Sequence, residues 1–425
     1  MSNVNAPGDE PSPVRPAKPP APPHGIRRDL QDLVDLPRSA LLSFLQKHMQ
    51  PRKPRTRAEA AEPSGYPALA AFAPQNLWNW LSEYWRYRIG RRHPFQTYDG
   101  RDGDTGVYRM RGADGEIRIA LAGDWGTGTD EAAKVAAGIE AFQPHYAIHL
   151  GDVYYVGDPM EVGANFLGVP NPRHPYYKPC KWPQGSEGSF SLNGNHEMYA
   201  RGFGYFDLIL PKLGMRGSPR GQGASYFCLE NDDWRIIAVD TGYNSVGLPI
   251  LEQFIKPGCA LPPALVEWLR AVVKPRPDDP RGVVILSHHQ YYSRFDHCYP
   301  EPARQLAEFF PRPVLWLWGH EHRLAIYREA AMEGGVRAFG RCIGHGGMPV
   351  DLPPAALHDF ETEFVDARVY PNDENLKIGF NGFAEMTLRG NRLALDYVDL
   401  NGTKVFGEVW TVDSGALARV TLQTG

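Results

Sequence analysis

Cysteine is scarce in this chain, and the few cysteines show no pairing pattern. Five of them are scattered through 425 residues, and no two form a Cys-x-x-Cys pair. An odd, scattered set argues against a disulfide framework and against a zinc site built from paired thiolates. A reducing compartment suits such a chain better than an oxidising one.

Long apolar runs are missing as well. No run approaches the roughly 20 residues that span a bilayer. Residues 1–23 are rich in Pro and Ala and lack the apolar stretch of a signal peptide. We therefore expect a cytoplasmic protein without a transmembrane segment.

An excess of positive charge is also absent. The formal net charge is −4 at pH 7, with 22% charged and 42% hydrophobic residues. These values are ordinary for a globular protein and give no electrostatic basis for nucleic-acid binding. The phosphate-binding motif Gly-x-x-x-x-Gly-Lys-Ser/Thr does not occur, and Gly123, Gly126 and Gly128 do not fit the dinucleotide fingerprint. A nucleotide-binding domain is therefore a poor interpretation.

Three regions differ in composition. Residues 1–25 form a Pro- and Ala-rich leader that we expect to be disordered. Residues 26–105 hold leucines and tryptophans at helical spacing, which predicts a helical extension. The extension docks either on the main domain, residues 106–425, or on a partner. A membrane-surface role is less well supported, because the polar face is short and mixed.

Strand-like and helix-like segments alternate from about residue 108. Apolar runs of strand length occupy 116–122, 146–150, 235–239, 282–286 and 314–318. Helices are predicted from the N-cap Thr129 to 142, and over 265–273 and 302–310. Such alternation predicts parallel strands with crossover helices, and active residues at the carboxyl ends of the strands.

The C-terminal part follows a different pattern. Segments 382–389, 392–400 and 404–412 read as strands, and they are joined at Gly390-Asn391 and Asn401-Gly402. Both junctions are typical of hairpin turns. The pattern predicts an antiparallel meander that packs beside the central sheets rather than folding alone.

Five short motifs bear the chemistry, and each except the third closes a clearly apolar run. They are Gly123-Asp124-Trp125-Gly126, Gly151-Asp152-Val153-Tyr154-Tyr155, Gly194-Asn195-His196-Glu197, Ser287-His288-His289 and Gly319-His320-Glu321-His322. Two carboxylates brought together repel each other unless cations lie between them. With the phenol, amide and imidazole groups, they predict two adjacent metal ions, which are typical of phosphate-ester hydrolysis.

These motifs resemble the calcineurin-like metallophosphoesterase superfamily and, within it, most of all the purple acid phosphatases. The superfamily usually opens with Asp-x-His, whose histidine is a ligand, but Gly126 stands at that position here. Purple acid phosphatases share this Asp-x-Gly pattern and compensate with a tyrosine three residues after the second aspartate. Tyr155 occupies that position, so the missing histidine and the present tyrosine corroborate each other.

The resemblance implies an α/β fold, a four-layer αββα sandwich of two mixed sheets that includes the C-terminal strands of 380–425. It also implies two metal ions, Fe³⁺ and a divalent Zn²⁺, Mn²⁺ or Fe²⁺. The implied ferric ligands are Asp124, Tyr155, His322 and the bridging Asp152; the implied divalent ligands are Asp152, Asn195, His288 and His320. Hard phenolate and carboxylate donors suit Fe³⁺, whereas imidazoles with an amide suit the divalent ions.

Two histidines are candidates for catalysis. His196 directly follows Asn195, and His297 lies nine residues after His288, which matches the spacing of the family's catalytic histidine. Either one can donate a proton or stabilise charge. His289 is open between a supporting role and replacement of His288 as a ligand.

We therefore expect a phosphoesterase, most like a phosphomonoesterase, that hydrolyses small-molecule phosphate esters by attack of a metal-activated hydroxide. A phosphodiesterase or nucleotide pyrophosphatase on the same metals remains open, because pocket walls decide that choice. A non-catalytic scaffold is the third interpretation, which the complete ligand set opposes. Tyr176, Tyr177, Lys178, Lys181 and Trp182 are expected to line the pocket.

Overall fold

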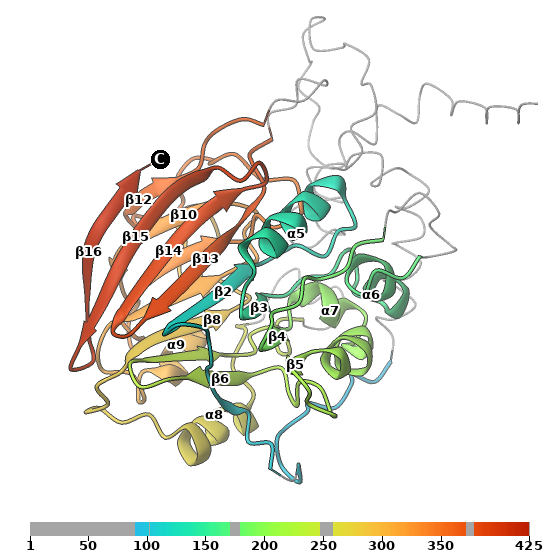
Figure 1. The fold of residues 1–425 in the computed structure, drawn as a ribbon, viewed down its shortest axis with the longest axis horizontal. Coiled ribbons are helices and arrows are strands. Elements are labelled where there is room, and N and C mark those ends of the chain that lie inside the picture. Colours follow the sequence, from blue (N-terminus) through green and yellow to red (C-terminus); the bar gives the residue numbers. More distant parts are fainter. Residues whose placement is uncertain (1–89, 102, 171–178, 247–257, 371–377, 425) are drawn as a thin grey trace, which may run out of the picture.

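The computed structural model describes residues 90–424, apart from 102, 171–178, 247–257 and 371–377. Within this part, two eight-stranded sheets form the centre of the molecule (Figure 1). The predicted leader and residues 26–89 of the predicted helical extension lie outside the described residues. The described residues of 90–105, the rest of that extension, form no helix.

The first sheet is parallel at its centre. Its strands lie in the order β1 (Val107–Arg109), β6 (Phe227–Glu230), β7 (Trp234–Ala238), β8 (Gly282–Ser287), β9 (Val314–Trp318), β11 (Ala338–Ile343), β10 (Leu324–Ala330) and β12 (Thr362–Val365). The run β7-β8-β9-β11 is parallel throughout. β10 is antiparallel to both β11 and β12, which makes the sheet mixed.

The second sheet joins the C-terminal meander to the start of the domain. Its strands lie in the order β16 (Ala416–Thr424), β15 (Lys404–Asp413), β14 (Arg392–Asp399), β13 (Gly382–Arg389), β2 (Glu116–Ala122), β3 (Tyr146–His149), β4 (Gly188–Ser191) and β5 (Gly214–Met215). β2, β3 and β4 are parallel, whereas β13 to β16 are antiparallel neighbours and β13 is antiparallel to β2. The predicted meander is confirmed.

Helices cover the outer faces of both sheets. On the second sheet lie α5 (Asp130–Phe142), α6 (Pro159–Asn165), α7 (Asn195–Tyr199), η2 (Tyr205–Ile209) and η3 (Leu210–Lys212). On the first lie α8 (Pro263–Trp268), η5 (Leu269–Val273) and α9 (Pro300–Leu306). A third apolar core, formed by residues of both sheets, lies between them. The four-layer sandwich of two mixed sheets is confirmed.

Among the described helices, α5 is the longest, and it forms where its sequence signals predicted it. The hydroxyl of Thr129 accepts a hydrogen bond from the backbone N–H of Ala132, and Asp130 and Glu131 occupy the first turn. Both features compensate the unpaired N–H groups and the positive dipole of a helix start. Ala132, Val135 and Ile139 are buried at helical spacing and attach the helix to the second sheet.

The segment that precedes β1 also lies against the domain. The Arg92 guanidinium donates to the Tyr243 carbonyl at 2.6 Å and lies 4.6 Å above the centre of its ring. The His93 ring stacks on Phe206 at 4.8 Å. These contacts tie the chain to the domain well before its first strand.

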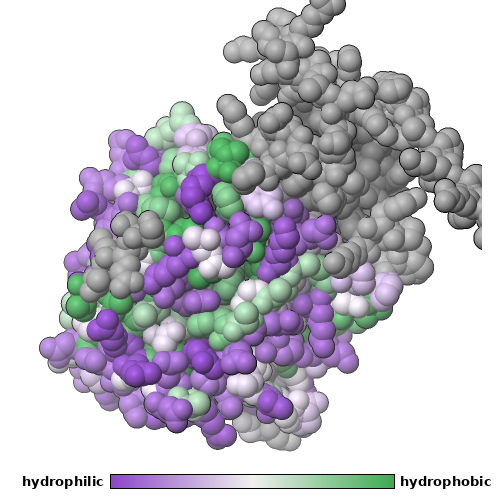
Figure 2. Space-filling view, turned by 45° about the horizontal axis from the view of Figure 1, so that its top comes forward, coloured by the Kyte–Doolittle hydropathy of each residue, from purple (hydrophilic) through white to green (hydrophobic). Residues whose placement is uncertain are grey.

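Among the described residues, no helix is both long and apolar enough to cross a membrane. No disulfide joins the five cysteines, all of which are described and buried. On the face shown in Figure 2, hydrophobic side chains (green) lie in small groups among hydrophilic ones (purple).

Candidate metal centre

The sequence motifs meet where strands of both sheets end. Asp124 follows β2, Asp152 follows β3 and Asn195 follows β4; His288 follows β8 and His320 follows β9. The strands within each of these sets are parallel. Because parallel strands end at the same edge of a sheet, their next residues gather there.

Three of these residues have backbones in the left-handed region. The φ angles are 58° at Asp124, 72° at Asp152 and 66° at His320. Such angles are uncommon outside glycine and persist where the surrounding structure imposes them. Here the N–H of Asp124 donates to the carbonyl of Gly151 at 3.0 Å. The N–H of His320 donates to Oδ2 of Asp124 at 2.7 Å.

Asp124 and Asp152 are buried side by side. Their exposed fractions are 0% and 1%, and a single phenol hydroxyl, that of Tyr154, joins them. Its oxygen lies 2.7 Å from Oδ1 of Asp124 and 3.2 Å from Oδ2 of Asp152. Within the described part of the chain, neither carboxylate pairs with a lysine or arginine. The ionic partners are imidazoles: His322 lies 3.5 Å from Asp124, and His288 lies 3.2 Å from Asp152.

Hydrogen bonds outside the cluster orient the nitrogen and oxygen donors toward it. Nδ1 of His288 donates to the carbonyl of Leu150 at 2.9 Å, so Nε2 faces the site. The amide nitrogen of Asn195 donates to the hydroxyl of Tyr199 at 3.1 Å. Its oxygen therefore turns toward Nε2 of His288, 3.1 Å away. Such supporting bonds fix the tautomer and direction of metal ligands.

The electrostatics of the cluster favour positive charge. Burial disfavours the ionised form of Asp152, but His288 and His196 outweigh it and hold the pKa of that carboxyl well below its ordinary value. Burial opposes protonation of His288, yet Asp152 and Asp124 raise its pKa to about 9. The carboxylates that draw a proton to an imidazole draw a metal cation in the same way.

The phenol of the cluster belongs to Tyr154, one residue before the tyrosine that the resemblance implied. Besides both carboxylates, its hydroxyl contacts Nε2 of His322 at 3.0 Å. The side chain of Tyr155 instead packs against the apolar core under the helices of the second sheet. Its carbonyl accepts a hydrogen bond from Nδ1 of His196.

A local pattern distinguishes the two tyrosines. Val153 forms a parallel β-bridge with Gly126. Side chains on either side of an extended residue point the same way, so residues 152 and 154 share a direction. The alternation in Asp152-Val153-Tyr154 therefore accounts for the position of the Tyr154 hydroxyl at the two carboxylates.

The two candidate catalytic histidines differ in position. His196 lies inside the cluster: its N–H donates to Oδ1 of Asp152 at 3.0 Å, and its Nε2 lies 3.8 Å from Oδ2. His297 is exposed, on the loop between β8 and α9. Its ring lies 4.9 Å from that of Tyr299, whose ring is 6.0 Å from that of His320. His297 therefore lies beside the cluster, one aromatic ring away.

His289, left open by the sequence, also lies at the cluster. Nitrogen atoms of His288, His289 and His320 come within 4.8 Å of one another, and so do donor atoms of Asp124, Asp152 and His288. Nδ1 of His289 lies 3.1 Å from the hydroxyl of Thr241. Burial lowers the pKa of His289 well below its ordinary value, so its ring is neutral at pH 7.

Glu197 is a supporting residue that the sequence analysis did not assign. Its Oε2 accepts from the N–H of Gly194 at 2.9 Å and from the N–H of Asp152 at 3.2 Å. It thereby holds the second and third motifs together. Burial, with the nearby charge of Asp152, raises its pKa to about 8. An acidic residue three positions after a helix N-cap has the spacing of a capping box. This spacing in the sequence could have indicated the role of Glu197.

We expected Trp182, in the long insertion, to line the pocket, and this expectation is wrong. This side chain is 1% exposed. It packs between Trp125, at 5.1 Å, and Phe166, at 6.0 Å, because a wide aromatic surface is stabilised by burial. Tyr176, Tyr177 and Lys178 lie outside the described residues.

The donor set fits two metal ions. Carboxylate, phenol, amide and imidazole atoms converge, and they are ligand types of iron, zinc and manganese sites. In the described part of the chain, the two buried carboxylates have imidazoles and no lysine or arginine as ionic partners. A bound cation could replace the protons of those imidazoles.

Residues 117–324 match the family model of the calcineurin-like phosphoesterases. This chain contains a calcineurin-like phosphoesterase domain. The matched part runs from β2 to the first residue of β10 and includes every residue of the cluster. The phosphoesterase domain as folded is larger, since the second sheet draws four of its strands from the C-terminal meander.

Several solved structures are similar to this chain. The purple acid phosphatase PPD1 of yellow lupin (Lupinus luteus) is 12% identical over 69% of this chain and 53% of its own, with a TM-score of 0.46. GAP50, the anchor in the inner membrane complex of Plasmodium, is 16% identical over 70% and 89%, with a TM-score of 0.43. PhoD is 13% identical over 73% and 72%, with a TM-score of 0.43.

This chain thus spans about half of the lupin protein's length, 53%. Identities and TM-scores this low transfer neither activity nor metal content from those proteins to this one. No curated protein matches the chain.

Proposed function

We propose that this phosphoesterase domain hydrolyses phosphate monoesters with two metal ions held at the cluster. One observation carries the proposal: Asp124 and Asp152 are fully buried, share the hydroxyl of Tyr154, and have imidazoles as their ionic partners. A pair of carboxylates arranged in this way is stable as a binding site for cations.

The proposed ligands divide into two sets that share Asp152. The first, suited to Fe³⁺, comprises Asp124, Tyr154, His322 and Asp152; the second, suited to Zn²⁺, Mn²⁺ or Fe²⁺, comprises Asp152, Asn195, His288 and His320. Contacts within each set support the division, because Tyr154 and His322 contact Asp124, while His288 contacts Asp152 and Asn195. When bound, the two ions would supply the charge that activates water and neutralises the phosphate oxygens.

His297 is proposed to protonate the leaving group. In hydrolysis, a water oxygen bonds to phosphorus, the ester P–O bond breaks, and the departing oxygen takes up a proton. A histidine is suited to donate it, since its pKa lies near neutrality. The exposed position of His297, one ring away from the cluster, suits contact with a departing group rather than with the phosphate.

His196 is proposed to act within the cluster. Its Nδ1 must carry the hydrogen, because the carbonyl of Tyr155 can only accept one. In the neutral ring, Nε2 is then a proton acceptor that faces Asp152 at 3.8 Å. Burial lowers the pKa of His196, which favours this neutral form. We propose that His196 orients the attacking water or accepts its proton.

The test combines metal analysis with turnover on the full chain. Protein loaded with iron and zinc should contain two ions and release phosphate from p-nitrophenyl phosphate faster than it cleaves bis(p-nitrophenyl) phosphate. Faster cleavage of the diester would replace the monoesterase by a phosphodiesterase. Protein that binds neither metal after reconstitution would refute the proposal and favour a scaffold.

A further inference from the structure

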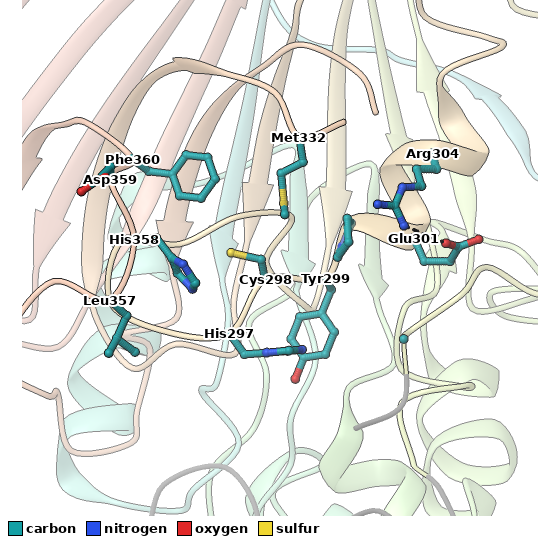
Figure 3. Close-up of a pocket in the computed structure, with 12 residues that line it drawn as sticks. His297, Cys298, Tyr299, Glu301, Arg304, Met332, Leu357, His358, Asp359 and Phe360 are labelled. Carbon is teal, nitrogen blue, oxygen red and sulfur yellow. Dashed lines mark ion pairs between the residues drawn. The ribbon is translucent and has the colours of Figure 1, made fainter. Parts of the chain in front are cut away.

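A pocket of about 860 Å³ has Tyr299 in its lining, and the ring of Tyr299 also contacts histidines of the metal cluster. The pocket is lined by the loop between β8 and α9, by α9 itself, and by residues 357–360. In the view of Figure 3, Met332 and Phe360 lie opposite His297 and Tyr299 across the pocket. Its volume is in the range of pockets that bind small organic molecules.

The ring of Tyr299 is a wall common to the pocket and the cluster. It lies 5.1 Å from the ring of His289 and 6.0 Å from that of His320, and it also lines the pocket. His297 lines the pocket as well and meets Tyr299 edge to face, at 4.9 Å and 83°. Tyr299, with His297 against it, therefore stands between the pocket and the histidines of the cluster.

The walls of the pocket combine flat or apolar side chains with a charged rim. Met332 and Phe360 are half-buried, and Leu357 is 66% exposed. Among the side chains that the structure describes, Leu357 is the most exposed large hydrophobic one. Charged groups stand at the edge, where Arg304 lies 3.6 Å from Glu301 on α9. An apolar lining with a polar edge suits a flat ring that has polar substituents at its periphery.

We propose that this pocket receives the leaving group of the phosphate ester and that this group contains an aromatic ring. The inference rests on the proposed function and names the substrate class of that site. With the ring against Met332, Leu357 and Tyr299, the ester oxygen lies on the side of His297, which protonates it as the P–O bond breaks. The chemistry is the same for a nucleoside and for an aryl alcohol.

The experiment compares two pairs of substrates on the metal-loaded full chain. Benzyl phosphate and cyclohexylmethyl phosphate have the same number of ring carbons and similarly weak leaving groups, but only the first has a flat ring. AMP and ribose 5-phosphate test a nucleobase by its presence or absence. We expect kcat/KM to be about tenfold higher for the aromatic member of at least one pair, as aromatic contacts of this kind provide. The preferred pair identifies the source of the ring.

A double variant tests whether the pocket causes that preference. Met332→Gln with Leu357→Asn keeps size and net charge but removes apolar surface. The kcat/KM of the aromatic substrate should then exceed that of its partner by no more than about threefold. The control Val420→Asn changes an exposed valine on β16, which is outside the pocket, and should leave both ratios unchanged.

Two different failures are distinguishable. Equal kcat/KM within both pairs, or a preference that the double variant retains, would overturn the pocket inference while the phosphoesterase activity stands. Metal-loaded protein that hydrolyses none of the four esters would overturn the proposed function and the inference with it.

Discussion

Arg341 and Glu408 bury a positive and a negative charge between the two sheets, whereas Asp124 and Asp152 bury two negative charges at the strand ends. All four side chains are 0–1% exposed. Arg341 binds Glu408 through two short hydrogen bonds, of 2.6 and 2.7 Å, and its remaining amino group donates to two backbone carbonyls. The first cluster is therefore compensated within the protein.

The second cluster is not compensated in this way. Its cationic partners are imidazoles, whose charge depends on a proton that a metal ion can replace. The difference separates a buried pair that completes itself from a buried pair that we propose to bind metal. A buried pair that satisfies itself needs nothing further, whereas a buried pair of like charges marks a place where a ligand completes the site.

The largest effect is expected from Asp152→Asn. It removes the carboxylate shared by both proposed metal sets, so metal binding and activity should be lost together, with a fall in kcat/KM of at least about a thousandfold. Metal analysis and phosphate release on the same sample measure both. Asp366→Asn is the control, because Asp366 is a buried carboxylate paired with Arg368 outside the cluster. Full metal content in Asp152→Asn would contradict the bridging role.

Glu408→Gln should break the ion pair of Arg341 and Glu408 without changing the metal content. Leaving the Arg341 charge buried without its partner should lower the free energy of unfolding by about 3 kcal/mol, measured by denaturant titration at saturating metal. The double variant Arg341→Met, Glu408→Leu removes both charges and should recover much of that loss. Loss of metal from folded Glu408→Gln protein would show that the two clusters are coupled.

His297→Ala tests whether His297 acts from outside the proposed metal cluster. Loss of a general acid should lower kcat about a hundredfold for esters with poor leaving groups, while the metal content stays at two ions because His297 lies outside the cluster. Turnover of p-nitrophenyl phosphate, whose leaving group needs little protonation, is the internal control. A loss of metal would instead make His297 a ligand.

Tyr154→Phe and Tyr155→Phe test which phenol belongs to the cluster. In oxidised, iron-loaded protein, a visible tyrosinate-to-iron absorption band should disappear in Tyr154→Phe and persist in Tyr155→Phe. For Tyr154→Phe we expect kcat to fall only about tenfold. Losses of about 10- to 100-fold are typical when one group that supports a metal site is removed. A band that survives in Tyr154→Phe and vanishes in Tyr155→Phe would restore the assignment implied by family resemblance.

Much of the fold was readable from local patterns. The strands β2, β9 and β13 begin and end where the apolar runs predicted, and Thr129 caps α5 as predicted. The predicted helix over 302–310 is displaced: α9 begins at Pro300, where proline is suited to the first turn, and ends at Leu306. β11 was not predicted, because it contains the buried Arg341 and a glycine, which interrupt an apolar run.

By itself, the sequence determined which chemical groups are available and where the strands that deliver them end, because hydrophobic periodicity and turn residues act over a few neighbouring positions. Only the tertiary structure decided that Tyr154, rather than Tyr155, joins Asp124 to Asp152, that Glu197 supports Asp152, and that a pocket lies beyond Tyr299. A local pattern can give the direction of Tyr154 and the cap at Glu197, but the contacts of Tyr154 with Asp124 and of Glu197 with Asp152 join residues 30 and 45 positions apart, and only the folded chain brings these together.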